Sequence, residues 1–367
     1  MDIYKEFNIK TVINAQSWVT KLGGSIMSIE VLDAMNKASS AFVDVEELHE
    51  KCSEQIANLC DSESALITSG CASAIVLMSA AVICAKDESL IDEIPNLTKR
   101  KEILIHANQR NHYDSALEMT GAKLIEYKNI DDIRRKFTKE SVAIAFVEAP
   151  FIGIGLGIDE TVKIGNEFNL PVIVDASARI PPVKNLFKFI NAGASMVSYS
   201  GGKGIRGPQN TGFILGKKSY IDLAKRNLIC FSDTKAKIGR SMKVSKECLV
   251  GLVVALKLFL DINQEEIWAG WKEKAKFIVK ELSNIEGLDV KLEDDGINRE
   301  GPQAVIYFNN NWKGFSPNEI RLLLEKGDPP IYVGEGGYKD EINLAMTNIQ
   351  EGQEKIIAEK LKDILIK

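Results

Sequence analysis

The chain has 367 residues, of which 45% are hydrophobic and 26% are charged. These values are typical of soluble globular proteins and exclude a disordered or collagen-like chain, and the length is enough for two domains. The chain has 46 Lys and Arg against 51 Asp and Glu, so its formal net charge is −5, and it lacks the strongly basic character of a dedicated nucleic-acid-binding protein.

Short apolar runs alternate with amphipathic stretches between about residues 60 and 215. We expect strands at residues 64–68, 102–105, 123–127, 142–148, 171–175, 196–199 and 212–215. Helical patterns lie between them, for example at residues 73–85 and 161–168. Apolar strands separated by helices are typical of a mostly parallel sheet that is covered on both faces. The sequence therefore predicts a three-layer α/β/α domain with its ligand site beyond the carboxyl ends of the strands.

The pattern changes after residue 239. We expect helices at residues 245–261, 268–285 and 317–325, strands at 290–292, 304–308 and near 331–333, and a C-terminal amphipathic helix. This mixture predicts a smaller α+β domain. The expected parts are an N-terminal arm at residues 1–20, a large domain at 21–244 and a small domain at 245–367.

Several sites and locations are excluded by the sequence. No window approaches the roughly 18 consecutive apolar residues of a membrane helix, and residues 1–10 lack the apolar core of a secretory signal. The three histidines have no metal-ligand spacing, so we expect no metal site. None of the cysteines forms a C-x-x-C pair, and free thiols in a reducing cytoplasm are expected. They are Cys52, Cys60, Cys71, Cys84, Cys230 and Cys248.

The glycine-rich segment at residues 198–209 follows an apolar strand and places Lys203 between glycines. A lone motif of this kind is more often a flexible surface turn. It is not a Walker loop, because Val197 stands at the position of the first glycine and Gly204 follows the lysine. Residues 153–157 do not form a dinucleotide motif either, because Ile158 occupies the position of the last glycine.

Two further strand ends carry groups that complement this lysine. Asp175 ends an apolar strand, where its carboxylate needs a cationic partner such as a protonated pyridine nitrogen. Residues 68–73, Thr-Ser-Gly-Cys-Ala-Ser, are typical of a turn into a helix, whose N-terminal N–H groups bind anions. An anion cradle, an acid and a lysine at strand ends are the three parts of a pyridoxal phosphate site.

Short motifs spread from about residue 10 to residue 260 carry a family resemblance. They are Asn14-Ala15, Leu22-Gly23-Gly24-Ser25, Phe42-Val43-Asp44, Glu46-Glu47-Leu48, Thr68-Ser69-Gly70, Val174-Asp175-Ala176, Ser200-Gly201-Gly202-Lys203, Gly207-Pro208-Gln209 and Gly239-Arg240. With these motifs the chain resembles the selenocysteine-synthase-like branch of fold-type-I pyridoxal phosphate enzymes. It is most similar to the short members, which include D-glucosaminate-6-phosphate ammonia-lyase-like proteins.

The resemblance implies roles for particular residues. Lys203 is the lysine that forms the Schiff base with the cofactor, and Asp175 is the partner of the pyridine nitrogen. The residues at the phosphate position are Ser69, Gly70, Cys71, Ser198 and Ser200. The resemblance also implies a homodimer or larger assembly with active sites at the subunit interfaces.

The chain departs from the family pattern at several positions. Gln16 stands where a small residue is expected, and Gly334 stands where relatives often have an Arg, which affects how a substrate carboxylate is bound. Gln109 occupies the place of a His that usually covers the cofactor ring. Gln109 is thus a candidate cofactor-binding residue, with Arg110 and His112 as substitutes in the covering role.

Other side chains near these motifs also carry expectations. Cys71 replaces a small aliphatic residue as a steric equivalent, and a thiol at a helix N-terminus can have a lowered pKa. Arg206, Arg240 and Lys243 are surface cations by default and candidates for binding an anionic substrate.

The expected activity is that of a pyridoxal phosphate-dependent lyase acting on an amino acid or amino-sugar acid. Lys203 would take the proton from Cα, and β-elimination followed by ammonia release would give a 2-keto acid. The fold equally permits other reactions on amino acids. One alternative is selenium transfer to seryl-tRNA, which the net charge of −5 disfavours. Another is a binding protein that retains the fold without turnover.

Overall fold

The computed structural model describes residues 3–149, 152–153, 155–228, 236–294, 300–335 and 340–366. Ile154 and Cys230 lie outside the described residues. The chain forms two compact units, each with its own sheet. The larger unit comprises residues 27–262, and the smaller one combines residues 1–26 with residues 263–367. None of the described helices is long and apolar enough to cross a membrane.

The sheet of the larger unit confirms the strands expected from the sequence, whose ends shift by one residue at most. Among the described residues its strand order is β2-β8-β7-β6-β5-β3-β4. Neighbours from β7 to β4 pair in parallel, whereas β8 is antiparallel to both β2 and β7. The strands are β2 (Ser64–Thr68), β3 (Glu102–His106), β4 (Lys123–Tyr127), β5 (Ser141–Val147), β6 (Val172–Asp175), β7 (Met196–Ser200) and β8 (Gly212–Gly216).

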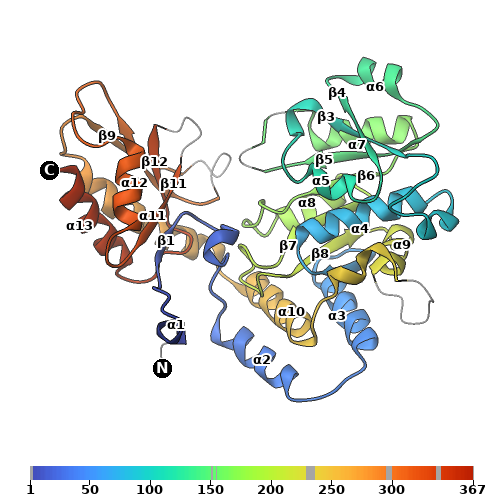
Figure 1. The fold of residues 1–367 in the computed structure, drawn as a ribbon, viewed down its shortest axis with the longest axis horizontal. Helices are drawn as coiled ribbons and strands as arrows, with labels where there is room; N and C mark the ends of the chain where they lie inside the picture. The colour runs from blue at the N-terminus through green and yellow to red at the C-terminus, as the bar shows by residue number, and fades with distance from the viewer. Residues whose placement is uncertain are drawn as a thin grey trace. The chain divides into compact units, whose positions relative to one another are not determined.

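Helices cover both faces of this sheet, and its strands are therefore buried on both sides. On β6, Ile173 belongs to one core and its neighbours Val172 and Val174 belong to the other. Helix α4 (Cys71–Cys84) is apolar around its circumference and lies along β7 and β8 in the core that contains Ile173 (Figure 1). The three-layer α/β/α architecture of fold type I is therefore confirmed.

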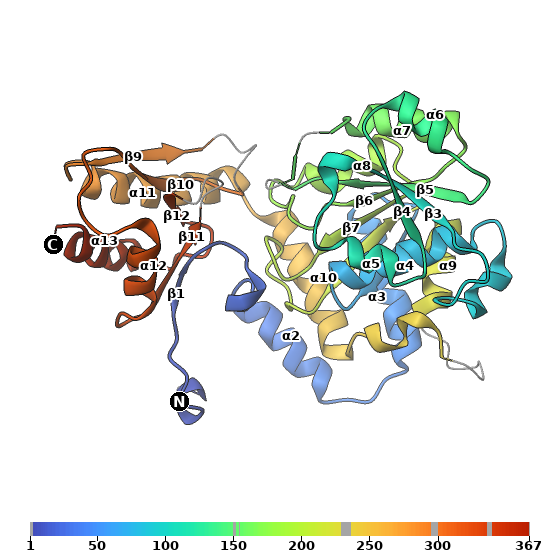
Figure 2. The ribbon, with the colours of Figure 1, turned by 45° about the horizontal axis from the view of Figure 1, so that its top comes forward.

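The opposite face carries a group of helices that includes α10. Figure 2 shows α2 and α3 beside α10. Leu252 and Leu256 of α10 are fully buried in the core of this face. The helices of the larger unit besides α4 are α2 (Ile29–Ser39), α3 (Val45–Leu59), α5 (Asp114–Glu118), α6 (Ile130–Lys136), α7 (Ile158–Glu167), α8 (Asn185–Asn191), α9 (Lys218–Leu228) and α10 (Lys246–Asp261).

The smaller unit is an α+β structure. Its sheet has the order β1-β11-β12-β10-β9 among the described residues, with β1 parallel to β11 and the other pairs antiparallel. The elements are α1 (Ile3–Glu6), β1 (Ile13–Ala15), α11 (Gln264–Leu282), β9 (Leu288–Glu293), β10 (Gln303–Phe308), α12 (Pro317–Glu325), β11 (Ile331–Glu335), β12 (Glu341–Ala345) and α13 (Gln353–Leu365).

The unit boundaries differ from those expected at residues 20/21 and 244/245. Ile13 and Ala15 bury their side chains as part of strand β1, so the N-terminal segment belongs to the sheet of the smaller unit. Helix α10 begins at Lys246, one residue after the expected start, and Ser245 is its N-cap, whose hydroxyl accepts a hydrogen bond from the Cys248 N–H. Its apolar face packs against α2 and α3 of the larger unit, because that is where the complementary apolar surface lies.

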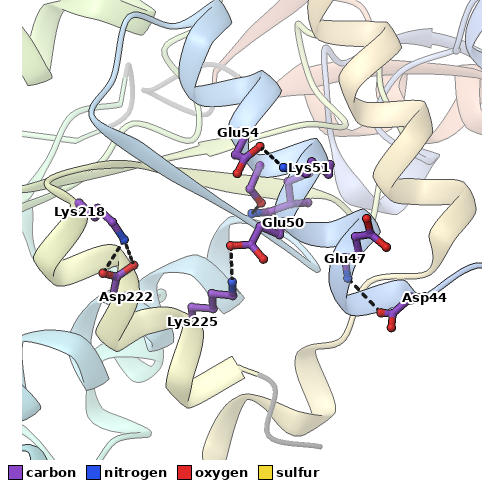
Figure 3. A network of polar contacts seen from close by, with 10 residues as sticks. Asp44, Glu47, Glu50, Lys51, Glu54, Lys218, Asp222 and Lys225 are labelled. Atoms are coloured by element: carbon purple, nitrogen blue, oxygen red, sulfur yellow. Dashed lines mark hydrogen bonds and ion pairs between the residues drawn. The ribbon is translucent and has the colours of Figure 1, made fainter.

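Strand β2 is an edge strand, and α3 covers part of its free edge. His49 Nε2 donates to the Ile67 carbonyl at 2.8 Å, and the Ser53 hydroxyl accepts from the Ile67 N–H at 3.3 Å. On the surface around them, α3 and α9 are joined by an ion pair between Glu50 and Lys225 at 3.2 Å (Figure 3). Because this ion pair is largely exposed, it contributes little to stability compared with the buried contacts of His49 and Ser53.

We predict that His49 makes the stability of the fold depend on pH. The side chain is 4% exposed, and burial lowers the pKa of His49 below its usual value of 6.5. The unfolded chain therefore binds a proton more readily than the folded chain, so stability falls as the pH drops through about 6.5. Lowering the pH from about 7.5 to about 5.5 should therefore lower the melting temperature of the wild type more than that of His49→Gln. An equal fall in both proteins would contradict this prediction.

Candidate active site

The strand register of the larger unit brings several sequence motifs to one edge of the sheet. Asp175 at the end of β6 lies opposite Ser198 of β7. Gly212, the first residue of β8, lies opposite Ser200 at the end of β7 and opposite Thr68 at the end of β2. The segments that follow β2, β6 and β7 therefore leave the sheet next to one another, and these segments carry the residues singled out from the sequence.

The turn from β2 into α4 exposes the N-terminus of a 14-residue helix. Gly70 has φ +128°, a conformation that favours glycine, and the Thr68 hydroxyl donates to its carbonyl at 2.9 Å. Among the residues that the structure describes, no side chain caps the helix, so main-chain N–H groups of its first turn are left for an anion. The hydroxyls of Ser69 and Ser73 lie 2.9 Å apart beside this turn.

Within the part of the chain that the structure describes, only one of the two carboxylate oxygens of Asp175 accepts hydrogen bonds. Oδ1 accepts a hydrogen bond from the Ser177 N–H at 2.9 Å and lies 3.5 Å from the Cys71 sulfur. Oδ2 receives no hydrogen bond from the described residues. The side chain is only partly buried. The second oxygen is therefore available to a donor from a bound molecule.

Cys71 connects the helix start to Asp175. Its sulfur lies 3.1 Å from the Ser198 hydroxyl, and the pKa of Cys71 is raised well above its usual value. Burial is the main cause and the nearby Asp175 charge adds to it, whereas the Lys203 charge acts in the opposite direction. The expectation of a lowered pKa at the helix N-terminus was wrong. Asp175 ends β6 and Lys203 follows the neighbouring strand β7, so both residues lie at this edge of the sheet.

Lys203 lies in a closed loop between β7 and β8. The Gly201 N–H donates to the Thr211 carbonyl at 2.9 Å, and the Gly207 N–H donates to the Gly201 carbonyl at 2.8 Å. Within the loop, the Arg206 N–H donates to the Lys203 carbonyl at 2.9 Å. These bonds hold the lysine in a tight loop, in contrast to the flexible surface turn that a lone motif of this kind most often forms.

Two glycines beside Lys203 are needed because other main-chain atoms come close. A Cβ atom on Gly202 would lie 2.3 Å from the Gln209 Cα, and one on Gly204 would lie 2.3 Å from the Ile180 carbonyl oxygen. Neither neighbour is a flexible side-chain end, so the loop would have to move. The glycines on both sides of the lysine thus fix its position by allowing close packing.

We predict that Gly202→Ala displaces this loop and lowers the melting temperature. The added Cβ overpacks the loop, which costs about 1–3 kcal/mol. Gly270→Ala is the matched control, because nothing lies within 4 Å of a Cβ at this position in helix α11. The control should be neutral or slightly stabilising, since Ala favours helix over Gly. A Gly202→Ala protein as stable as the wild type would contradict the close packing.

Known proteins resemble this chain in sequence and in fold. A family model described as L-seryl-tRNA selenium transferase matches residues 156–270. The chain is 27% identical to D-glucosaminate-6-phosphate ammonia lyase of Salmonella typhimurium (strain 14028s / SGSC 2262), over 99% of this chain and 98% of that protein. It is 24% identical to L-seryl-tRNA(Sec) selenium transferase of Aquifex aeolicus (strain VF5), over 98% of this chain and 85% of that protein.

A solved structure titled D-glucosaminate-6-phosphate ammonia-lyase superposes with a TM-score of 0.84 at 26% identity, covering 100% of this chain and 98% of that one. The chain is a fold-type-I, pyridoxal phosphate-dependent enzyme. The resemblance to the selenocysteine-synthase-like branch is thereby confirmed.

The residues of the site fit this cofactor. Pyridoxal phosphate carries a phosphate, a protonated ring nitrogen and an aldehyde. The uncapped start of α4 suits the phosphate, Oδ2 of Asp175 suits the ring N–H, and Lys203 supplies an amine for the aldehyde. The fit rests on observed features of this chain: an uncapped helix start and a carboxylate oxygen without a hydrogen bond from the described residues.

Two serines expected at the phosphate have different surroundings in this enzyme. Ser198 is fully buried, and its hydroxyl donates to the Val174 carbonyl at 3.2 Å and contacts Cys71. Ser200 is partly exposed at the end of β7, opposite Gly212. Ser198 therefore lies beside Asp175 on the neighbouring strand, and Ser200 with Ser69 remain the candidates for the phosphate.

The candidates for covering the cofactor ring are also differently placed. Gln109 is 3% exposed, and its side-chain oxygen accepts a hydrogen bond from a main-chain N–H at the end of β5. Arg110 binds the carboxylates of Asp114 and Glu126. His112 is exposed. Gln109 thus stabilises the edge of the sheet at the site, and Arg110 is held by two acids.

The remaining candidates are divided between the units. Gln16 and Gly334 belong to the smaller unit, where Gly334 lies in β11. Arg206 lies in the Lys203 loop with φ +59°, and burial lowers the pKa of its guanidinium. Arg240 and Lys243 are exposed. Of these three cations, Arg206 alone lies in the same loop as Lys203, three residues after it.

Sequence reasoning missed an ion cluster that follows the ends of β5 and β6. Glu148 directly follows β5, and its carboxylate lies 3.2 Å from the Arg179 guanidinium and 2.8 Å from the Lys188 ammonium. Two cations therefore share one carboxylate at the edge that carries Asp175. The positions of Glu148 and Arg179 in the sequence could have pointed to this cluster, since both residues follow the ends of two neighbouring strands.

Proposed function

We propose that this enzyme is a lyase that removes ammonia from an amino acid or amino-sugar acid. The proposal rests on one observation: Oδ2 of Asp175 is available at the same edge of the sheet as Lys203 and the start of α4. The similarity to D-glucosaminate-6-phosphate ammonia lyase favours this reaction among those that the fold permits.

Each part of the site has a role in this proposal. The N–H groups at the start of α4, with Ser69 and Ser200, bind the phosphate of the cofactor. Oδ2 of Asp175 accepts a hydrogen bond from the ring nitrogen and keeps it protonated. Lys203 attaches the cofactor through its ε-amine. When bound, pyridoxal phosphate supplies a ring that accepts electron density from Cα of the substrate.

Lys203 also moves the proton. When it is not bonded to the cofactor, the Nζ of Lys203 would be the base that takes the proton from Cα of the substrate. Loss of this proton would let a leaving group on Cβ depart with its bonding electron pair, and addition of water to the resulting imine would release ammonia and a 2-keto acid. The tight loop around Lys203 keeps the amine beside the substrate during both steps.

Cations near the strand ends suit an anionic substrate. Arg179 and Lys188 both contact Glu148 beside these strand ends, and Arg206 lies three residues after Lys203. Guanidinium groups bind carboxylates and phosphates in a bidentate manner. We therefore propose a phosphorylated amino-sugar acid as the preferred substrate class. We also propose a cytoplasmic location, because the cysteines form no C-x-x-C pair and free thiols persist in a reducing compartment.

We predict that pyridoxal phosphate becomes attached to Lys203. Borohydride reduction of the holoenzyme followed by mass spectrometry should place the cofactor on the peptide that contains this residue. Lys203→Ala should lose the attachment and reduce ammonia release by at least about a thousandfold, because both the amine and the base are removed. Lys163→Ala, which removes an exposed lysine from α7, should keep both properties. Attachment at another lysine would contradict the assignment.

A substrate panel separates the lyase from its alternatives. The panel contains D- and L-amino acids and phosphorylated amino-sugar acids, with ammonia as the readout. Seryl-tRNA with a selenium donor tests the activity named for the selenium transferases. Oxygen uptake and carbon dioxide release test that of a relative named 5'-C-glycyluridine monooxygenase-decarboxylase from Streptomyces sp, which is 26% identical over 90% of this chain and 83% of that protein. If the protein binds the cofactor but converts none of these substrates, the alternative of a binding protein that retains the fold without turnover is favoured.

We further propose that the enzyme is a homodimer or a larger homo-oligomer. Apolar side chains of the larger unit are exposed on α2 and on the segment that follows it. Ile29 and Leu32 lie on α2, and Val43 precedes α3. Phe42 is 105% exposed. Large exposed apolar side chains gathered on one segment are typical of an interface, and a second copy of the chain is the commonest partner.

We predict that the double variant Leu32→Ser, Phe42→Ser weakens self-association. Loss of two apolar side chains should raise the dimer dissociation constant by about a hundredfold. Light scattering coupled to gel filtration, over a dilution series, measures this change. Phe315→Ser is the control, because it removes from the smaller unit an apolar side chain that is about as exposed as Leu32. An unchanged mass for the double variant would rule out this face as the interface.

A further inference from the structure

We propose that the Cys71 thiol is a positioning residue that orients the Asp175 carboxylate toward the cofactor ring. This inference rests on the proposed function, because it assigns Oδ2 of Asp175 to the ring nitrogen. It goes further, because the sequence placed Cys71 at the phosphate only as the equivalent of a small aliphatic residue. In the structure its side chain contacts Asp175 instead.

Among the described residues, the side-chain hydrogen bonds of Asp175 all involve one carboxylate oxygen. The Ser177 N–H donates to Oδ1 at 2.9 Å, and the Cys71 sulfur lies 3.5 Å from the same atom. The two donors come from different segments, the turn after β6 and the first turn of α4. A carboxylate held on Oδ1 from two directions has a fixed orientation, and its Oδ2 is left for the ring nitrogen.

Cys71 is suited to this role because its thiol stays protonated. Its sulfur has two acceptors within reach, Asp175 Oδ1 and the Ser198 hydroxyl. Ser198 has another partner in the Val174 carbonyl, so its hydroxyl does not depend on the thiol. The carboxylate is the stronger acceptor. Burial keeps the pKa of Cys71 high, so the group acts as a donor and not as a nucleophile.

The contact also ties two parts of the site together. Helix α4 presents its N-terminus to the phosphate, and β6 presents Asp175 to the ring nitrogen. A hydrogen bond between Cys71 and Asp175 fixes the spacing between these two subsites. An Ala at this position would keep the main-chain N–H of α4 but would remove the link.

Substitutions of Cys71 test whether its side chain acts as a hydrogen-bond donor or only fills space. Cys71→Ala removes the donor, and Cys71→Ser retains one. Cys84→Ala is the matched control, since Cys84 is a buried thiol at the other end of α4, about 20 Å away along the helix. The readouts are the visible absorbance spectrum of the bound cofactor and the dissociation constant of pyridoxal phosphate, measured by titration of the apoenzyme. Circular dichroism and melting temperatures verify folding.

We expect Cys71→Ala to weaken pyridoxal phosphate binding by about two- to tenfold, the effect of one neutral hydrogen bond, and to alter the spectrum. Cys71→Ser should restore both readouts, and Cys84→Ala should match the wild type. If Cys71→Ala does not fold, Cys71→Val takes its place, because it fills the space without a donor.

Two results overturn the positioning role while the proposed function stands. One is wild-type affinity and an unchanged spectrum in the donor-free variant, and the other is equal loss in the alanine and serine variants. Failure of the wild type to bind pyridoxal phosphate at Lys203 would instead overturn the proposed function and this inference together.

Discussion

The antiparallel course of β8 is the constraint on which the site depends. Because β8 is hydrogen-bonded between β2 and β7, its first residue, Gly212, lies opposite the last residues of both strands. A Cβ at Gly212 would lie 2.7 Å from the Gly70 main chain, so only glycine lets β8 begin this close to the turn before α4. The helix start and the Lys203 loop, which are more than 130 residues apart in the chain, therefore become neighbours.

Much of the larger unit could be predicted from the sequence, because its strands are continuous apolar runs. The same property located Asp175 and Lys203, since both follow such runs at the strand ends. Strands β1 and β12 were missed for physical reasons. Strand β1 has only three residues and needs β11 beside it. Strand β12 contains Glu341 and Asn343, whose polarity hides a fully buried strand.

The surroundings of individual side chains could not be derived from sequence. The helix N-terminus alone suggested a lowered pKa for Cys71, but burial and the charge of Asp175 outweigh it. The interaction of a charged group with a helix dipole is worth about 0.3–2 kcal/mol, whereas full burial of the group shifts its pKa by up to about 3–5 units. Burial is therefore the larger effect. Likewise, the role of Gln109 depends on its distance from β5, which only the three-dimensional structure gives.

The cover that α3 places over β2 has a consequence beyond the stability of one monomer. An open edge strand offers its main chain to strands of other molecules and can nucleate fibrous aggregates. At Ile67 the edge of β2 is already occupied by His49 and Ser53, which use the main-chain groups that an incoming strand would need. The enzyme therefore protects this margin of its sheet from intermolecular β-pairing with polar side chains of its own.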